Sequence, residues 1–476
     1  MNKKKQYLKI KKETPRKREA EQRVVDFHPT YYLFSKEEAD TQSLRCIKCP
    51  VDLLKGLESE FSFCRTGCPL ENKIPIWIEE VKEGDIKGAF EASNEISPFP
   101  EILGMVCPHD VLCQGGCTIA KTENGSVSIG AIEVYLNEQA FKMGLKPDYG
   151  QNRQKSGKRV AVIGSGPAGM SCATFLLRGG VDVDMFEKSD RPGGLLTYGI
   201  PNFKIKKDVI LRRFNWMQEA GMNLHLNSDI QSSEQLKRML DDYDAIFVGI
   251  GAPSSRGARM KNEDAHGVYH VMDILKHAQK RVFEDFYESI LENKHVVVIG
   301  GGDSAMDAVR TSVRMKAKSV RCAYRRDEAN MPGSVKEVIN AKEEGVIFEF
   351  YTAPKEVIID KGRHVKGLLC QRTQLGEPDE SGRRKLEVIE NSEFTLECDV
   401  IILALGFDNV ELPWYDDAQI NTGKWGDIIV DDEKRTSNAK IYAGGDAVRG
   451  ADLAVTAAAD GRKAALAMLK KFNINL

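Results

Sequence analysis

Two glycine-rich segments of this chain have the spacing of turns that bind the phosphates of a dinucleotide. In the first, Gly164, Gly166 and Gly169 follow an apolar run at 160–163 and open onto a helical pattern. Glycines at these positions permit a tight turn, a close approach of the backbone to a pyrophosphate, and close packing of helix on strand. Glu187 ends the next strand-like run, where a carboxylate accepts hydrogen bonds from a ribose 2′-hydroxyl. This segment therefore predicts a site for a nucleotide with a free ribose, such as FAD or NAD.

A second copy of the pattern follows the apolar run 295–299, and it differs in one informative way. Its turn consists of Gly300, Gly302, Ser304 and Ala305 with the residues between them. The strand-like run after its helix ends in Arg325 and Arg326, where an NAD-binding unit would carry an acid. An arginine accommodates a ribose 2′-phosphate, whereas a carboxylate would repel it. The second copy therefore predicts an NADP site.

Cysteines are concentrated in the first quarter of the chain. Seven of the eleven precede residue 120, namely Cys46, Cys49, Cys64, Cys68, Cys107, Cys113 and Cys117. The C-x-x-C and C-x-x-x-C-P spacings among them are typical of iron–sulphur proteins, and seven thiolates are one short of two four-cysteine clusters. Zinc and a purely structural thiol cluster are the alternatives. Beside nucleotide-binding units an iron–sulphur centre is favoured, because zinc carries no electrons.

The composition is that of an ordinary globular protein and excludes several function classes. With 476 residues, 42% hydrophobic and 29% charged, two or three domains are expected. A formal net charge of −2 gives no basis for binding nucleic acid or a membrane surface, and no apolar run is long enough to span a bilayer. The basic start lacks the apolar core of a secretory signal, so a cytoplasmic protein is expected. We expect this start to be a solvated tail, with a docking arm for an acidic partner as the alternative.

Other patterns predict the elements that must position these residues. Helical periodicity over 74–94 and 129–143 predicts a small helical domain around the cysteines, with metal as a main source of its stability. Buried strand-like runs end in glycine at 244–251 and 399–406, as expected for paired crossings between two nucleotide-binding domains. A last strand and turn at 440–446 leads into an alanine-rich helix. The sequence therefore predicts an α/β protein behind a helical metal domain.

The order of these motifs resembles the family of the small (β) subunit of bacterial glutamate synthase. It equally resembles the N-terminal half of dihydropyrimidine dehydrogenase and the NADPH-side subunits of ferredoxin:NADP oxidoreductases. The motifs are CxxC with CxxxCP, VCPxxxxCxxxC, IGAIE, GSGPAG, GGLLxYGIP, GGGDSA, YRR and GGDA, and they cover the chain from about Arg45 to its end. The resemblance implies two Rossmann-like domains, with the NADPH domain inserted in the FAD domain. The expected boundaries are 1–150 for a helical iron–sulphur domain with a basic N-terminal arm, 151–257 and 407–476 for the FAD domain, and 258–406 for the NADPH domain.

The resemblance also implies two [4Fe-4S] clusters whose ligands cross over between the cysteine motifs. One cluster would be held by Cys46, Cys49, Cys64 and Cys117. The other would be held by Cys68, Cys107, Cys113 and the carboxylate of Glu133 in IGAIE. Without the resemblance, Glu133 would be taken for a solvated helix glutamate. The segment between Cys49 and Cys64 is longer than the spacer usual in the family.

For the nucleotides, the resemblance implies FAD at the first turn and NADPH at the second. Gly164, Gly166, Gly169 and Glu187 would hold the ADP half of FAD, Gly194 and Leu195 would lie beside the flavin, and Gly445 and Asp446 would meet the pyrophosphate and ribityl chain. NADPH would lie on Gly300, Gly302, Ser304 and Ala305, with Arg325 and Arg326 on the 2′-phosphate. No cysteine pair follows the first turn as it does in disulphide oxidoreductases, so electrons must leave through the cysteine domain.

These features together predict an NADPH-dependent oxidoreductase, the electron-input subunit of a glutamate synthase. Electrons would pass from NADPH through FAD and two [4Fe-4S] clusters to a large subunit that forms glutamate from glutamine and 2-oxoglutarate, in a hetero-oligomer. We name no catalytic acid or base, because hydride transfer between stacked rings depends on positioning. The alternatives are a ferredoxin:NADP oxidoreductase subunit, in some cases bifurcating, the reductase partner of a pyrimidine dehydrogenase, and a scaffold with vestigial nucleotide sites.

Overall fold

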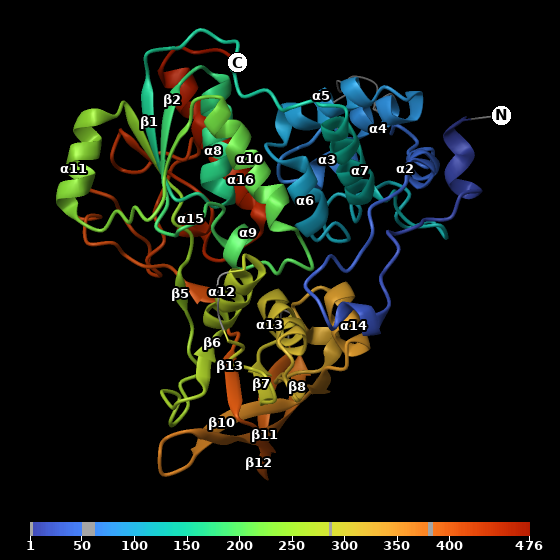
Figure 1. Ribbon diagram of the computed structural model, residues 1–476, viewed down its shortest axis with the longest axis vertical. Helices are drawn as coiled ribbons and strands as arrows, with labels where there is room; N and C mark the ends of the chain where they lie inside the picture. The colour runs from blue at the N-terminus through green and yellow to red at the C-terminus, as the bar shows by residue number, and fades with distance from the viewer. Residues whose placement is uncertain (1–2, 50–61, 285–287, 379–383) are drawn as a thin grey trace.

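The chain folds into three packed parts, one helical and two built on parallel sheets (Figure 1). The computed structural model describes residues 3–49, 62–284, 288–378 and 384–476. We call the parts the helical domain, the first-sheet domain and the second-sheet domain, in the order in which each begins along the chain. The helical domain and the first-sheet domain lie side by side, and the second-sheet domain lies below both in the view of Figure 1.

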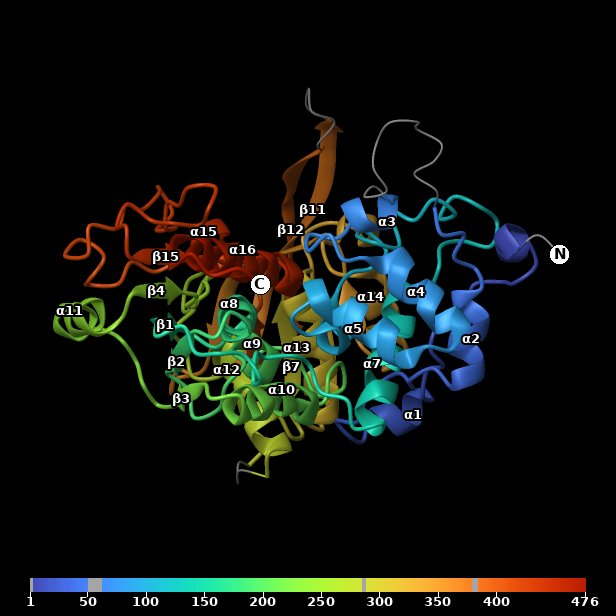
Figure 2. The same cartoon turned by 90° about the horizontal axis from the view of Figure 1, so that it is seen from above.

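The first-sheet domain contains a five-stranded parallel sheet in the order β15-β4-β1-β2-β3. The strands are β1 (Arg159–Ile163), β2 (Asp182–Phe186), β3 (Asn223–His225), β4 (Ala245–Val248) and β15 (Ile441–Ala443). The helices are α8 (Pro167–Arg178), α9 (Leu195–Tyr198), α10 (Lys207–Glu219), α11 (Ser233–Asp242), α15 (Asp446–Arg449) and α16 (Ala454–Lys471). Seen from above, α16 lies over α8 (Figure 2), where Gly461 is so close that a Cβ would stand 2.0 Å from the Ala168 carbonyl oxygen. Small residues on α16 therefore allow the close packing that covers this face of the sheet.

The second-sheet domain is inserted between β4 and β15 of the first. Its parallel sheet has the order β6-β13-β7-β8-β9. The elements are β6 (Val268–His270), α12 (Val271–Val282), β7 (His295–Ile299), α13 (Asp303–Arg314), β8 (Ser319–Ala323), the 3-10 helix η3 (Glu328–Asn330), α14 (Val335–Glu343), β9 (Ile347–Glu349) and β13 (Val400–Leu403). The two crossings between the domains pair with each other as β5 (Ser254–Ser255) and β14 (Phe407–Asp408). The predicted α/β fold with one nucleotide-binding domain inserted in another is confirmed.

An antiparallel sheet that the sequence analysis did not predict closes the second-sheet domain. It consists of β10 (Thr352–Ile359), β11 (Val365–Pro378) and β12 (Arg384–Glu397), and it lies at the bottom of Figure 1. Alternate residues of β10 and β11, including Val357, Leu368 and Cys370, join a core with the facing strands β7 and β13. This sheet therefore covers one face of the parallel sheet, whereas α12 and α13 cover the other.

The helical domain holds all seven clustered cysteines. Its elements are η1 (Lys3–Leu8), α1 (Ala20–Arg23), α2 (Lys36–Ser43), α3 (Phe63–Thr66), α4 (Ile74–Glu83), α5 (Ile86–Ile96), α6 (Pro100–Val106) and α7 (Ile129–Lys142). The helical stretch predicted over 74–94 is two helices, because Gly84 takes a left-handed φ of 80° and Asp85 then caps α5 by accepting a hydrogen bond from Gly88 N at 2.9 Å. Around Trp77, which is fully buried, these helices form a core of their own.

A buried ion pair fixes the helical domain to the first-sheet domain. The Arg213 guanidinium of α10 donates two hydrogen bonds to the Glu101 carboxylate of α6, at 2.7 Å and 2.5 Å, and both side chains are fully buried. The neighbouring carboxylate raises the pKa of Arg213 even though burial opposes this. Because removing either partner would leave a buried charge alone, this contact resists separation of the two domains.

The basic N-terminal segment is packed against the protein, so the expected solvated tail is wrong for its described residues. The ammonium of Lys12 donates to Gln114 at 2.9 Å, between the cysteine loops. Further on, Arg23 is only 1% exposed and pairs with Glu343 at 2.7 Å and Glu344 at 3.1 Å in the second-sheet domain. Polar and acidic side chains of distant segments hold the cations of this segment, which composition alone does not reveal.

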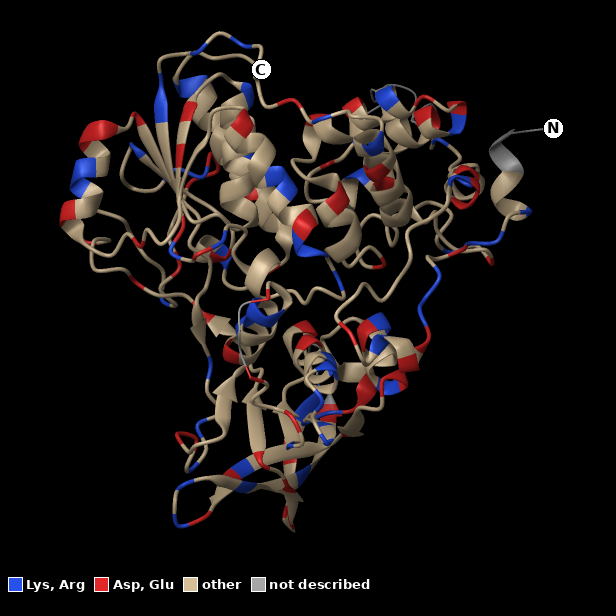
Figure 3. Ribbon diagram, in the orientation of Figure 1, with Lys and Arg blue, Asp and Glu red and all other residues tan. Residues whose placement is uncertain are grey.

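The distribution of charge and apolar helices agrees with the composition. Lys and Arg are interspersed with Asp and Glu over all three domains (Figure 3). Among the described residues, no helix has both the length and the apolar character needed to cross a bilayer.

Candidate functional site

The first glycine turn follows β1 and has a backbone that only glycine fits. Gly164 has a φ of 96°, and a Cβ on it would lie 2.4 Å from the Gly249 carbonyl oxygen after β4. A Cβ on Gly169 would lie 1.9 Å from the Gly164 carbonyl oxygen. Helix α8 begins directly after Gly166, with Pro167 in its first turn. The turn thus places the N-terminus of a helix at the end of a central parallel strand, which is where such sheets bind phosphates.

Three segments that lie far apart in the sequence meet at this turn. Gly166 faces open space, because a Cβ on it would have no heavy atom within 4 Å. A Cβ on Gly194, at the start of α9, would stand 3.0 Å from Gly166 Cα, and one on Gly445 would stand 3.0 Å from Ala168 Cβ. Beside them Leu195 is 44% exposed. The predicted residues at 164–169, 194–195 and 445 are therefore neighbours around an open cradle of backbone, and this fits a pyrophosphate and a flat ring system.

Glu187 lies at the end of β2, close to the same turn. Its carboxylate is only 4% exposed and accepts hydrogen bonds from Ser165 N at 3.1 Å, Ser165 Oγ at 2.5 Å and Ser189 N at 2.8 Å. Ser165 Oγ also accepts a hydrogen bond from Gly193 N at 2.9 Å. The acid is therefore held against the glycine turn, and its contact with a ribose stays a prediction.

Asp446 opens helix α15 next to Gly445. Burial raises the pKa of its carboxyl to about 6, and the nearby Asp452 raises it further. The backbone N–H of Asp452 donates to Asp446 Oδ1 at 3.3 Å. A half-buried carboxyl of this kind is suited to accept hydrogen bonds from ligand hydroxyls, which would stabilise its charged form. Asp446 therefore stays a candidate contact for a bound nucleotide.

The second glycine turn repeats the first at the end of β7. Gly300 has a φ of 146°, and a Cβ on it would stand 2.2 Å from the Ala404 carbonyl oxygen. Gly302, the N-cap of α13, would place a Cβ in open space, as Gly166 does. Ser304 is half-buried in the first turn of the helix, and Ala305 is fully buried in the core. This turn presents an open helix N-terminus with the geometry for a second phosphate group.

Two arginines follow β8, as predicted. The side chain of Arg325 is exposed and that of Arg326 is half-buried, with its Nε buried and without a hydrogen-bond partner. Within the described residues neither guanidinium forms an ion pair. Two cations without a protein anion beside an open helix N-terminus fit a nucleotide that carries an extra phosphate.

One group of four cysteines is defined by the effects of the thiols on one another. Burial raises the pKa of Cys64 to about 12, and the neighbouring Cys46, Cys117 and Cys49 raise it further. The pKa of Cys46 is raised to about 11, first by burial and also by Cys49 and Cys117. We call Cys46, Cys49, Cys64 and Cys117 the outer cysteine group. They are the four residues expected to hold the first cluster.

The remaining three cysteines lie together with Glu133. Burial raises the pKa of Cys107 well above its usual range, and Cys68, Cys113 and Glu133 add to this. We call these four residues the inner group, because Cys68 and Cys107 also pack against the core of the first-sheet domain. Burial raises the pKa of the Cys113 thiol, and Cys64 of the outer group adds to this rise after Cys68 and Glu133. The two groups are therefore adjacent.

Glu133 is buried in α7 and is not a solvated helix glutamate. It is 7% exposed, and its Oε1 accepts hydrogen bonds from Asn72 Nδ2 at 2.8 Å and Ser93 Oγ at 3.4 Å. Burial raises the pKa of this carboxyl to about 8. A carboxylate in such a place is costly without a positive partner, and a bound metal would supply one. The side chain therefore fits an oxygen ligand beside three thiolates.

A cluster places different demands on its ligands than a single ion does. In the described parts of the chain, no three Cys, His, Asp or Glu side chains form a set that could hold one metal ion. A [4Fe-4S] cluster takes one ligand on each of four irons, so its ligands surround a larger body. Residues 50–61, which contain most of the long spacer between Cys49 and Cys64, lie outside the described residues.

Comparison with known proteins agrees with this arrangement. The family model "Pyridine nucleotide-disulphide oxidoreductase" matches residues 158–461, and "dihydropyrimidine dehydrogenase domain II, 4Fe-4S cluster" matches residues 23–145. The oxidoreductase AegA of Escherichia coli (strain K12) is 46% identical over 95% of this chain and 68% of its own length. The glutamate synthase (NADPH) small chain of the same organism is 43% identical over 97% of each chain. Mycobacterium tuberculosis FprA in complex with NADPH has the same fold, with a TM-score of 0.55 at 19% identity over 66% of this chain and 85% of that one.

Fold and site together define an oxidoreductase with two nucleotide-binding domains of the FAD/NADP type and a 4Fe-4S domain in front of them. The chain belongs to the pyridine nucleotide-disulphide oxidoreductases and, among them, to the family of the glutamate synthase small chains. The family resemblance predicted from the motifs is confirmed.

Several residues that build these sites carry no signal in the sequence. Ser165, an unassigned position of the glycine turn, holds both Glu187 and Gly193 N. Asn72 holds Glu133 from a loop four residues after Cys68. Lys207 is buried and donates to the carbonyl oxygens of Leu196, at 2.9 Å, and Ile200, which shapes the loop after Gly194. Their roles depend on contacts between segments, which spacing along the chain does not encode.

Proposed function

We propose that this chain is the electron-input subunit of a glutamate synthase. It oxidises NADPH and delivers electrons, by way of FAD and two [4Fe-4S] clusters, to a large subunit that forms L-glutamate from L-glutamine and 2-oxoglutarate. It acts in the cytoplasm as part of a hetero-oligomer. The observation that carries the proposal is the combination, in one chain, of two open nucleotide turns with two groups of four candidate iron ligands. Full-length similarity to glutamate synthase small chains supports the partner.

In this proposal the first glycine turn holds FAD, which supplies the step from a hydride to single electrons when it is bound. The backbone at Gly164, Gly166 and Gly169 approaches the pyrophosphate, and Glu187 binds the ADP ribose. Gly194, Leu195, Gly445 and Asp446 line the flavin and its chain. Support comes from the open cradle that these segments form. The protein acts chiefly by alignment, so no side-chain acid or base is assigned.

The second glycine turn holds NADPH in the same proposal. Gly300, Gly302, Ser304 and Ala305 form the phosphate turn, and Arg325 and Arg326 bind the 2′-phosphate. The two guanidinium groups support this, because within the described residues no protein anion neutralises them. A carboxylate in their place would repel the 2′-phosphate and select NADH.

The two cysteine groups would carry electrons from FAD to the acceptor protein. The inner group, with Cys68 and Cys107 against the core of the first-sheet domain, would hold the cluster nearer the flavin. In the outer group, Cys46, Cys64 and Cys117 pack in the core of the helical domain, and this group would hold the cluster that faces the acceptor. The effect of Cys64 on the pKa of Cys113 supports a close approach of the two groups, across which electrons would pass from one cluster to the other.

A second candidate function follows from the similarity to AegA. That protein is 46% identical over 95% of this chain, yet this chain spans only 68% of it. An oxidoreductase with a different electron acceptor would use the same nucleotide turns and cysteine groups. A ferredoxin:NADP oxidoreductase subunit or the reductase part of a pyrimidine dehydrogenase belongs to the same class, and only the acceptor separates these functions.

The test is to purify the chain anaerobically with its candidate large subunit and to measure iron, sulphide and flavin for each chain. About eight irons and one FAD are expected, with NADPH oxidation that requires glutamine and 2-oxoglutarate and yields glutamate. The same cofactors without glutamate formation would move the function to another acceptor. Zinc in place of iron would refute the electron path.

The role of Glu133 has a separate test with a matched control. Glu133→Gln removes the charge and keeps the hydrogen bonds to Asn72 and Ser93, so iron content should fall by up to half while FAD is retained. Glu138→Gln lies on the same helix, where Glu138 pairs with Arg212 at 2.5 Å, and should keep all its iron. Full iron content and unchanged cluster spectra in Glu133→Gln would exclude the ligand role.

A further inference from the structure

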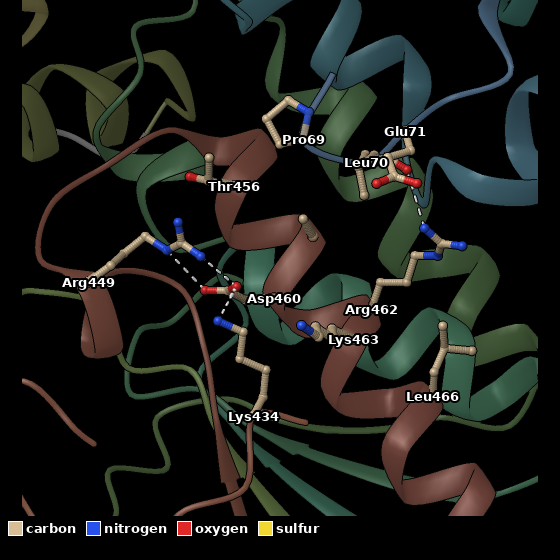
Figure 4. Close-up of a pocket in the computed structure, with 11 residues that line it drawn as sticks. Pro69, Leu70, Glu71, Lys434, Arg449, Thr456, Asp460, Arg462, Lys463 and Leu466 are labelled. Carbon is tan, nitrogen blue, oxygen red and sulfur yellow. Dashed lines mark hydrogen bonds and ion pairs between the residues drawn. The ribbon is translucent and has the colours of Figure 1, made fainter. Parts of the chain in front are cut away.

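A pocket of about 500 Å³ lies between the helical domain and helix α16 (Figure 4). One wall is the loop 69–71, directly after Cys68, and the other is the face of α16 that points away from α8. Its charged lining residues are Lys434, Arg449, Arg462, Lys463, Glu71 and Asp460. Four cations therefore share this space with two carboxylates, and the pocket carries an excess of positive charge.

The buried carboxylate of Asp460 holds two of the pocket's cations in place. It is 3% exposed and accepts hydrogen bonds from Arg449 Nη2 at 2.6 Å and Arg449 Nε at 3.1 Å, with Lys434 Nζ at 2.7 Å. Asp460 thus binds both cations, as Figure 4 shows, and Arg449 has a second carboxylate, Asp452, at 3.6 Å. An anion entering the pocket would meet cations that are already positioned, so little conformational entropy is lost on binding.

The other two cations have unused hydrogen-bonding capacity. Arg462 donates from Nη1 to the Leu70 carbonyl oxygen at 3.3 Å, but its Nε is buried and has no partner. Within the described residues, no hydrogen bond or ion pair is formed by the Lys463 ammonium. A buried guanidinium nitrogen without an acceptor is unfavourable, and an anionic ligand would satisfy it.

We propose that this pocket binds a small polyvalent anion of the dicarboxylate or phosphate class. Its volume suits a small molecule, and cations converging from α16, the end of α15 and the loop before β15 suit an anion with several oxygens. The site is separate from both glycine turns. The proposal does not depend on which protein accepts the electrons.

Asp460 connects the pocket to the flavin turn of the proposed function. Besides the two cations, its Oδ2 accepts a hydrogen bond from Gly445 N at 3.1 Å. A Cβ on Gly444 would stand 2.8 Å from Asp460 Cβ, so the turn is tightly packed against this residue. An anion that draws Lys434 and Arg449 toward itself weakens their hold on Asp460 and changes the support of the turn. Occupancy of the pocket is therefore coupled to the surroundings of FAD, a step that rests on the proposed FAD site.

Calorimetric titration of the flavin-loaded full-length chain tests the site directly. Glutarate and inorganic phosphate serve as probes, each at an ionic strength held constant with KCl. Saturable binding of at least one probe, with one site in each chain, is expected. Lys463→Gln should weaken it about tenfold, as expected for the loss of one charged hydrogen bond. Lys470→Gln, on the same helix but paired with Glu433 outside the pocket, should bind as the wild type does.

Two further measurements separate the site from its coupling. Asp460→Asn keeps an acceptor for Gly445 N and releases Lys434 and Arg449 from the Asp460 charge, so the anion should bind at least as tightly while the flavin fluorescence no longer responds to it. If Asp460→Asn does not fold, Lys434→Gln takes its place. Lys434→Gln should weaken both the anion binding and the flavin response. Binding without any flavin response would remove the coupling and keep the site. Absence of saturable binding of both probes, or equal binding by Lys463→Gln and the wild type, would overturn the proposal.

Discussion

The two glycine turns of this chain are built on the same plan and differ mainly in the residues after the second strand. In the first-sheet domain the order is β1, α8, β2, and in the second-sheet domain it is β7, α13, β8, each with parallel pairing. Gly166 and Gly302 both open onto empty space at the N-terminus of the helix. The backbone that would receive a pyrophosphate is thus common to both domains.

The closing residues make the two turns different. Glu187 after β2 is buried and engaged by Ser165 and Ser189, whereas Arg325 and Arg326 after β8 form no ion pair among the described residues. The carboxylate is part of the folded turn, and the guanidinium groups are free to meet an anion. The comparison teaches that the turn creates a nucleotide site and that the charge beyond the second strand selects the nucleotide.

The largest expected effect comes from Gly169→Ala in the first turn. The new Cβ would stand 1.9 Å from the Gly164 carbonyl oxygen, so strand and helix must separate. We expect the free energy of unfolding to fall by about 3 kcal/mol and FAD to be lost from the purified chain. Urea unfolding and the flavin-to-protein absorbance ratio measure both effects.

Gly166→Ala is the matched control for this change. Its Cβ would meet no protein atom within 4 Å, and the φ of −64° suits alanine. Stability should therefore stay at the wild-type value while FAD content falls, because the methyl group occupies the space of the pyrophosphate. Full FAD content in Gly166→Ala would show that the cradle is not the phosphate site.

The next largest effect is expected from Arg325→Asp, which gives the second turn the charge of the first. The carboxylate would repel the 2′-phosphate, so kcat/KM for NADPH should fall about a hundredfold while that for NADH changes little. Steady-state reduction of a dye acceptor with each nucleotide measures this. Arg321→Asp in the preceding strand β8, where Arg321 pairs with Glu349 at 2.5 Å, serves as the control. An unchanged preference for NADPH would contradict the assignment.

The two sheet domains also differ in how a buried cation is compensated. In the second-sheet domain Arg310 is paired with Glu337 at 2.5 Å and Glu344 at 2.8 Å. In the first-sheet domain the buried Lys207 donates to carbonyl oxygens, and burial lowers its pKa from 10.5 to about 7. Between these pKa values the unfolded chain binds more protons than the folded one, so stability rises with pH.

Lys207→Met removes this titration and tests the difference. The free energy of unfolding of the wild type, relative to the variant, should rise by about 2 kcal/mol from pH 7 to pH 9. Urea unfolding of both proteins across this range gives the value, and groups common to both cancel. A difference that does not change with pH would mean that the ammonium keeps its ordinary pKa in the fold.

The local features of both domains could be predicted from the sequence, because buried parallel strands and glycine turns leave patterns in a few adjacent residues. The apolar run noted at 295–299 is β7 with the same bounds. The antiparallel sheet β10–β12 was missed, because its long strands alternate only partly and face both core and solvent.

Features that depend on contacts between distant segments could not be predicted. The N-terminal segment is held by Glu343 and Glu344, more than three hundred residues away, and nothing in the basic run announces these partners. Asn72 and Ser93, which hold Glu133, are ordinary polar residues in the sequence. Family motifs identified Glu133 as a candidate ligand, but only the fold shows that it is buried.

The smallest expected effect comes from Ala305→Gly, which gives the second turn the glycine that the first turn has at Gly169. Ala305 occupies the place of Gly169, and its methyl group is fully buried in the core against which α13 packs. Ala305→Gly should therefore fold and bind NADPH, with a loss of about 1 kcal/mol from lower helix propensity and the lost methyl group. Urea unfolding measures the loss, and nucleotide titration measures the binding. The second turn holds a methyl group at the position where the first turn has no room for one. If Ala305→Gly lost as much free energy of unfolding as Gly169→Ala, the two turns would share a stricter geometry than their closest contacts indicate.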